Sequence, residues 1–123
     1  MTSKLTIHLG AVVAVIAFAS TASAHALLKK AVPAVGGTVN ASPGEIRLSF
    51  SEGVEPRFSG IALATEGGAS VTLGKSNVDP SDNSTLIAPV PQPLKPGVYT
   101  VNWHAVSVDT HKTQGSFQFT VQP

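Results

Sequence analysis

Apolar and polar residues alternate along much of this chain, most clearly between Glu45 and Phe50. Ile46, Leu48 and Phe50 fall on one side of that segment, and charged or hydroxyl-bearing residues fall on the other. A two-residue period is that of a β-strand with one buried face. The pattern recurs in six further segments that we expect to form strands: residues 26–32, 61–63, 71–73, 86–90, 99–103 and 117–121.

Turn-forming residues separate these segments. Glycine, proline, asparagine and serine gather at residues 36–37, 42–44, 67–68, 79–83 and 96–97. No segment shows the period of an amphipathic helix. Seven short strands separated by such turns predict an all-β domain, a Greek-key β-sandwich or barrel. The longest polar stretch, Gly74–Asn83, is expected to be the loosest loop.

The first 24 residues have the three-part layout of a secretory signal peptide. Lys4 supplies a positive charge, Leu9–Ala19 is an uncharged apolar run, and Ala22-Ser23-Ala24 fits a signal-peptidase site. The apolar run is shorter than the roughly 20 residues that span a bilayer. We therefore expect cleavage after Ala24, export of the protein, and a single processed domain over residues 25–123. An uncleaved membrane anchor is the alternative.

Composition narrows the chemistry of the processed chain. The sequence has eight Lys and Arg against seven Asp and Glu, so loss of Lys4 balances the two. No basic patch indicates nucleic acid, and no pattern indicates an obligate dimer, so we expect a monomer. The chain has no cysteine, and its single methionine is Met1. Thiolate and thioether metal sites, and thiol catalysis, are therefore excluded after processing.

Cleavage after Ala24 would make His25 the first residue, and a terminal histidine offers its α-amine and its imidazole Nδ1 to one metal ion. Asp109 and His111 form a second donor group, and in an extended segment residues two apart project to the same side. Glu52 follows the 45–50 strand and is a further carboxylate that could approach. Nitrogen and oxygen donors of this kind suit copper(II). The ordinary alternative is that Asp109 shapes a turn and the histidines are surface residues.

His104, the remaining histidine of the processed chain, directly follows Trp103. Successive residues of a strand face opposite sides, and Trp103 is expected in the core with Tyr99 and Val101. His104 should then face outward; the alternatives are that it binds the metal itself or that it orients one of the ligands.

Segments at both ends of the processed chain resemble those of a known family. The segment from Tyr99 to His111, YTVNWHAVSVDTH, followed by Gly115 and FQFTV at residues 117–121, is similar to the C-terminal signature of the CopC family of periplasmic copper-binding proteins. HALL from His25 and LSFSE ending at Glu52 match the start of that family. The resemblance implies a seven-stranded Greek-key β-sandwich or barrel, cupredoxin-like or immunoglobulin-like. It implies one copper(II) per chain, bound by His25, Asp109 and His111, with Glu52 as a weak ligand or a support for one.

Some members of this family also bind copper(I) through a methionine-rich loop, which this chain lacks. The resemblance therefore implies a copper(II)-only, non-enzymatic protein of copper resistance, buffering or delivery, often beside an inner-membrane CopD partner. Two other functions stay open. One is a copper oxidase or monooxygenase of the histidine-brace type, and the other is a metal-free exported interaction module.

Overall fold

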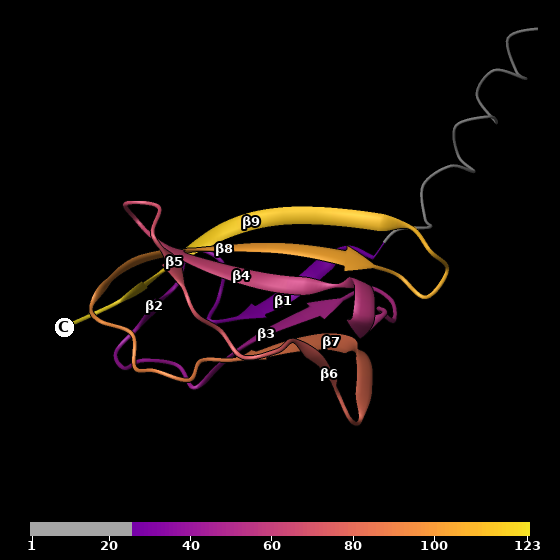
Figure 1. Ribbon diagram of the computed structural model, residues 1–123, viewed down its shortest axis with the longest axis horizontal. Helices are drawn as coiled ribbons and strands as arrows, with labels where there is room; N and C mark the ends of the chain where they lie inside the picture. The colour runs from indigo at the N-terminus through magenta and orange to yellow at the C-terminus, as the bar shows by residue number, and fades with distance from the viewer. Residues whose placement is uncertain (1–25) are drawn as a thin grey trace, which may run out of the picture.

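The computed structural model describes residues 26–123, and within them two β-sheets pack face to face (Figure 1). One sheet has the order β1-β3-β7-β6, with bounds Leu28–Val32, Glu45–Phe50, Asp82–Pro89 and Asn77–Asp79. The other has the order β2-β9-β8-β4-β5, with bounds Thr38–Val39, Lys112–Val121, Gly97–Val106, Gly60–Thr65 and Ser70–Val71. The pairs are antiparallel except β2 with β9, which is parallel. A short 3-10 helix, η2 (Pro56–Phe58), precedes β4. The all-β sandwich expected from the sequence is confirmed.

All seven predicted strands are present in the structure, and some of them begin or end at residues other than those predicted. β3 has the bounds that the alternating pattern predicts, and β1 ends at Val32, before Pro33. β8 and β9 are longer than predicted, because their ladder runs from Gly97 paired with Val121 to Val106 paired with Lys112.

The structure adds two short strands, β2 and β6. β6 lies inside Gly74–Asn83, so the expectation of a loose loop across that whole stretch is wrong. Val78 of β6 pairs with Leu86 and packs against the core, and the Asp79 carboxylate accepts a hydrogen bond from Arg47 at 2.6 Å. These contacts come from distant parts of the chain, and a polar local sequence does not reveal them.

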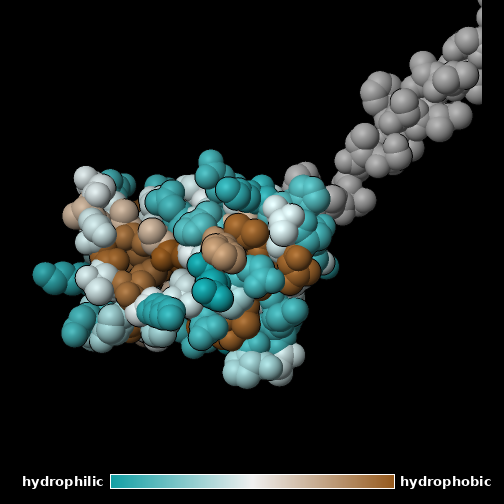
Figure 2. All heavy atoms as spheres, turned by 45° about the vertical axis from the view of Figure 1, so that its right-hand side comes forward, coloured by the Kyte–Doolittle hydropathy of each residue, from teal (hydrophilic) through white to brown (hydrophobic). Residues whose placement is uncertain are grey.

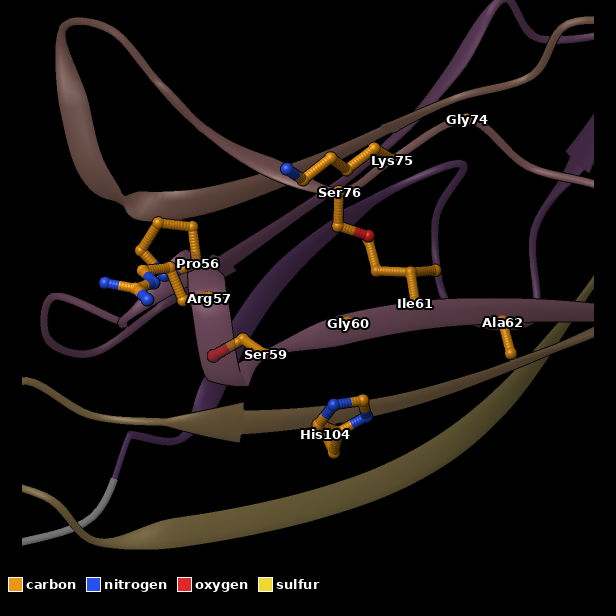
Figure 3. Close-up of a pocket in the computed structure, with 10 residues that line it drawn as sticks. All are labelled: Pro56, Arg57, Ser59, Gly60, Ile61, Ala62, Gly74, Lys75, Ser76 and His104. Carbon is orange, nitrogen blue, oxygen red and sulfur yellow. The ribbon is translucent and has the colours of Figure 1, made fainter.

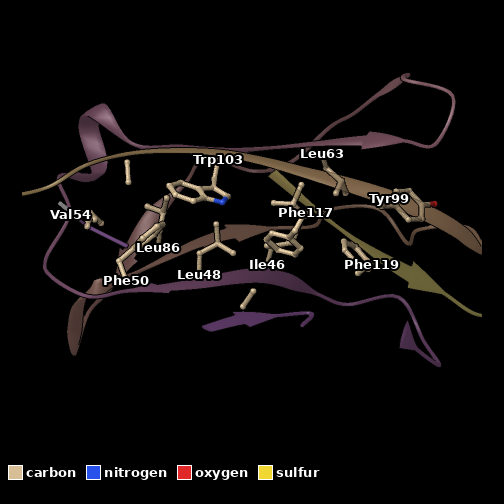
Figure 4. Close-up of a cluster of buried hydrophobic side chains, with 14 of the residues drawn as sticks. Ile46, Leu48, Phe50, Val54, Leu63, Leu86, Tyr99, Trp103, Phe117 and Phe119 are labelled. Carbon is tan, nitrogen blue, oxygen red and sulfur yellow. The ribbon is translucent and has the colours of Figure 1, made fainter. Parts of the chain in front are cut away.

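The core lies between the two sheets and is built from one face of each strand (Figure 4). Ile46, Leu48, Leu86, Val101 and Phe119 are at most 1% exposed. A fully buried aliphatic or aromatic side chain contributes about 1.5–3 kcal/mol of hydrophobic stabilisation, so each of these residues contributes substantially to the stability of the sandwich.

Trp103 packs into this core, as predicted. Its ring meets Phe50 edge-on, with centroids 5.1 Å apart and an interplanar angle of 66°. Gly115 is its neighbour on β9, and a Cβ there would lie 2.6 Å from Trp103 Cζ2. The glycine therefore leaves the space that the indole occupies.

Apolar side chains reach the surface in separate patches among hydrophilic ones (Figure 2). Leu27, Phe58 and Val108 are 61%, 61% and 51% exposed, respectively. No helix within residues 26–123 is long and apolar enough to cross a membrane.

Candidate metal centre

The turn between β8 and β9 brings Asp109 and His111 together. Asp109 Oδ1 lies 3.2 Å from His111 Nδ1, and both side chains are nearly half exposed. The turn is closed by hydrogen bonds from Ser107 N to His111 O at 2.9 Å and from Thr110 N to Ser107 O at 2.8 Å. Thr110 has a φ of 73°, in the left-handed region. The expectation of an extended segment here is therefore wrong, and a tight turn brings the two donors together instead.

A buried hydroxyl holds the aspartate in place. Ser107 is fully buried, and its Oγ donates a hydrogen bond to Asp109 Oδ1 and accepts one from the His111 amide at 3.2 Å. The Ser107 hydrogen bond, followed by that of His111, lowers the pKa of Asp109 below its ordinary value. The hydrogen bonds favour the charged form of the carboxylate, which is the form that binds a metal ion, and they restrain its orientation.

The segment after β3 ties this turn to the rest of the sandwich. Val54 forms a β-bridge with Ser107, Glu55 N donates to Val106 O at 2.8 Å, and Val108 N donates to Gly53 O at 3.0 Å. The backbone on the β8 side of the turn, from Val106 to Val108, is thereby paired with residues 53–55.

The start of the described chain is fixed at the same end of the sandwich (Figure 1). Thr113, two residues after His111, donates from Oγ1 to the carbonyl of the fully buried Ala26 at 2.9 Å. Leu27 and Ser51 exchange two hydrogen bonds, from Leu27 N to Ser51 Oγ at 2.9 Å and from Ser51 N to Leu27 O at 2.8 Å. His25 and the predicted signal segment 1–24 lie outside the described residues. Adjacent Cα atoms are about 3.8 Å apart, so the placement of Ala26 sets the region that His25 can reach.

Glu52 and His104 occupy different surroundings. Glu52 is half-buried and lies between Ser51, which bonds to Leu27, and Gly53, which bonds to Val108. His104 is exposed on the face of β8 opposite Trp103, as predicted from strand alternation.

The donor set within the described residues is incomplete for a metal. Across residues 26–123, no three or more His, Cys, Asp or Glu side chains lie close enough together to hold one ion. Asp109 and His111 supply one carboxylate and one imidazole, both of which suit copper(II), but a tetragonal site needs further donors. A terminal histidine beside Ala26 would supply two nitrogens.

Sequence reasoning missed Ser107, Thr113 and Ser51. Ser107 precedes Asp109 by two residues, so a serine in that position is a usable signal for a side chain that supports the aspartate. The Thr113–Ala26 contact joins residues 87 positions apart and follows from the tertiary fold alone.

Comparison with known proteins covers nearly all of the described chain. Residues 28–122 match the family model of the CopC domain. Protein YobA of Escherichia coli (strain K12) is 43% identical over 99 residues, which span 80% of this chain and 80% of that protein. CopC from Methylosinus trichosporium OB3b superposes with a TM-score of 0.75 at 32% identity, covering 80% of this chain and 95% of that one. PcoC, a methionine-rich copper resistance protein from Escherichia coli, superposes with a TM-score of 0.73 at 36% identity, covering 80% of this chain and all of that one.

Proposed function

The chain belongs to the CopC family of copper-binding, copper resistance proteins, and from this membership we propose that it is an exported copper(II) carrier or buffer of the periplasm. One observation supports the site most strongly. The Thr113–Ala26 hydrogen bond holds the residue after His25 beside the turn that carries Asp109 and His111.

We propose that one copper(II) ion is bound by His25 through its α-amine and Nδ1, by His111, and by the Asp109 carboxylate. The first two donors belong to one residue and close a chelate ring, so only processing after Ala24 would complete the site. Glu52 directly follows Ser51, which hydrogen-bonds to Leu27. We propose that Glu52 either supports one of the copper ligands or coordinates copper weakly.

The proposed site favours the oxidised ion. Imidazole, amine and carboxylate donors are typical of copper(II), whereas copper(I) prefers thiolate and thioether ligands. PcoC is described as methionine-rich, whereas this chain has no methionine after Met1. We therefore propose a copper(II)-only, non-enzymatic role, in which the metal is held in one oxidation state and passed on.

The proposed recipient is an inner-membrane protein of the CopD type. A groove of about 710 Å³ adjoins the site and is lined by Phe58, His104, Thr110 and Thr113, among others. A partner seated there would lie beside the turn that carries Asp109 and His111. The chain is proposed to act as a monomer in this transfer.

Copper(II) titration of the processed protein against a competing chelator tests the site. We expect one tightly bound ion per chain, and a loss of affinity of about tenfold or more when His25, Asp109 or His111 is replaced by alanine, since each removes a ligand. His104→Ala is the matched control, because it removes an exposed imidazole from the same end of β8. Retention of full affinity by His111→Ala, or an equal loss in His104→Ala, would contradict the proposal.

A further inference from the structure

A second hollow lies away from the Asp109–His111 turn, between η2, the start of β4 and the segment 74–76 (Figure 3). Its volume is about 550 Å³, within the range of small-molecule sites. The residues that line it include Arg57, Ser59, Gly60, Lys75, Ser76 and His104. A smaller hollow beside it is also lined by Arg57, Lys75 and Ser76 and adds Asn77.

The charged residues that line this pocket are all positive. Arg57 and Lys75 line both hollows, and no acidic residue lines either of them. Within residues 26–123, neither of these cations forms an ion pair. Arg47, by contrast, contacts Glu45 at 3.0 Å and Asp79 at 2.6 Å. The pocket therefore has positive charge that the described part of the protein leaves unbalanced.

Hydrogen-bond donors accompany the two cations. The Lys75 side chain extends toward the end of the pocket formed by Pro56 and Arg57 (Figure 3). Ser59 Oγ already accepts the amide of Val106 at 3.0 Å, so its hydroxyl hydrogen is available to a further acceptor. A guanidinium binds a carboxylate or a phosphate group through two parallel hydrogen bonds, and an ammonium adds a point charge.

Gly60 opens the floor of the pocket. A Cβ at this residue would lie 2.8 Å from His104 Cε1, so the missing side chain lets the imidazole lie across β4. β5 pairs with β4 only at Leu63 and Ala64, which leaves the start of β4 without a strand on that edge. A ligand can therefore approach along this edge.

We infer that this pocket binds a small polyanion whose oxyanion groups, carboxylate or phosphate, are held by Arg57 and Lys75. The attraction is local, because the basic and acidic residues of the chain nearly balance. The pocket contains none of the proposed copper ligands, so the inference can be tested independently of copper binding.

The test is a titration of the metal-free processed protein with citrate and, separately, with inorganic phosphate. Binding is measured from the amide chemical shifts in nuclear magnetic resonance spectra at constant low ionic strength. We expect saturable shifts centred on residues 57–60 and 75–77. Arg57→Gln and Lys75→Gln should each weaken binding by about three- to tenfold, the loss of one charge-assisted contact at an exposed site. Lys30→Gln is the charge-matched control, because Lys30 is exposed on β1 of the other sheet.

The two ligands identify the source of the oxyanion. Tighter binding of citrate supports a polycarboxylate ligand, and equal or tighter binding of phosphate supports a phosphorylated one. The inference is overturned if neither ligand gives saturable shifts, if the shifts centre elsewhere, or if Lys30→Gln weakens binding as much as Lys75→Gln. Unchanged shifts in the core of each variant would show that the fold is retained.

Discussion

Replacing Thr113 by valine should weaken copper(II) binding without altering any proposed ligand. Valine keeps the branched shape of threonine but cannot donate the 2.9 Å hydrogen bond to Ala26 O. Ala26 is 0% exposed, so its carbonyl would lose its partner in a place that water does not reach. The segment next to His25 would then fray, and copper binding would have to order it again.

The magnitude follows from that one bond. A neutral hydrogen bond contributes about 1 kcal/mol net, and an unpaired buried polar group costs about 1–3 kcal/mol. If about 1–2 kcal/mol of this is recovered only when copper binds, the affinity falls about five- to thirtyfold. Urea unfolding should show a loss of global stability of similar or smaller size.

The assay is chelator competition for copper(II), read together with the electron paramagnetic resonance spectrum. The spectrum should be unchanged, because the ligands are the same. Thr120→Val is the matched control: Thr120 is also half-buried on β9, at the far end of the strand, and makes no side-chain hydrogen bond within the described residues. The reasoning is refuted if Thr113→Val binds copper as tightly as Thr120→Val.

Three further changes probe the turn, the acid stability and the core. Ser107→Ala should raise the pKa of Asp109 toward its ordinary value, since it removes the largest cause of the depression; a carboxyl titration by nuclear magnetic resonance that finds no change would contradict the assigned hydrogen bond. The pKa of Asp79 is lowered to about 2 by a backbone amide and a guanidinium that hydrogen-bond to it. A folded-state pKa below the unfolded value of 3.8 stabilises the protein above that pH, and the contribution is lost as the pH falls toward 2. Asp79→Asn should therefore flatten the decline in unfolding free energy over this interval, and an undiminished decline would count against it. Gly115→Ala should lower the free energy of unfolding by about 1–3 kcal/mol, because the new Cβ overlaps the indole of Trp103; wild-type stability in urea would show that the indole has room to move.

The sandwich could be predicted because its strands carry their own pattern. Glu45–Phe50 alternates without interruption, and the structure places β3 at those bounds. Trp103 and His104 likewise take the opposite faces that strand alternation predicts. β6 could not be predicted in this way, because its pairing depends on contacts of Val78 with a neighbouring strand and on the Arg47 side chain.

The candidate site could be predicted only in part. The sequence indicates Asp109 and His111 as a pair of ligands; the structure places their side chains 3.2 Å apart, and their coordination of a metal stays a prediction. The two side chains come together for a different reason from the expected one. Thr110, in a left-handed conformation, turns the chain where an extended segment was expected. The Thr113–Ala26 bond depends on how the two sheets close, and no local pattern encodes it.

The most direct test of the proposed copper site is to add one glycine ahead of His25 in the processed protein. The peptide bond would convert the terminal amine into an amide while every side chain stays the same. We predict that the processed protein binds one copper(II) with a nitrogen-rich tetragonal resonance spectrum, and that the extended protein loses this spectrum and most of its affinity. Identical spectra and affinities for the two proteins would contradict the account.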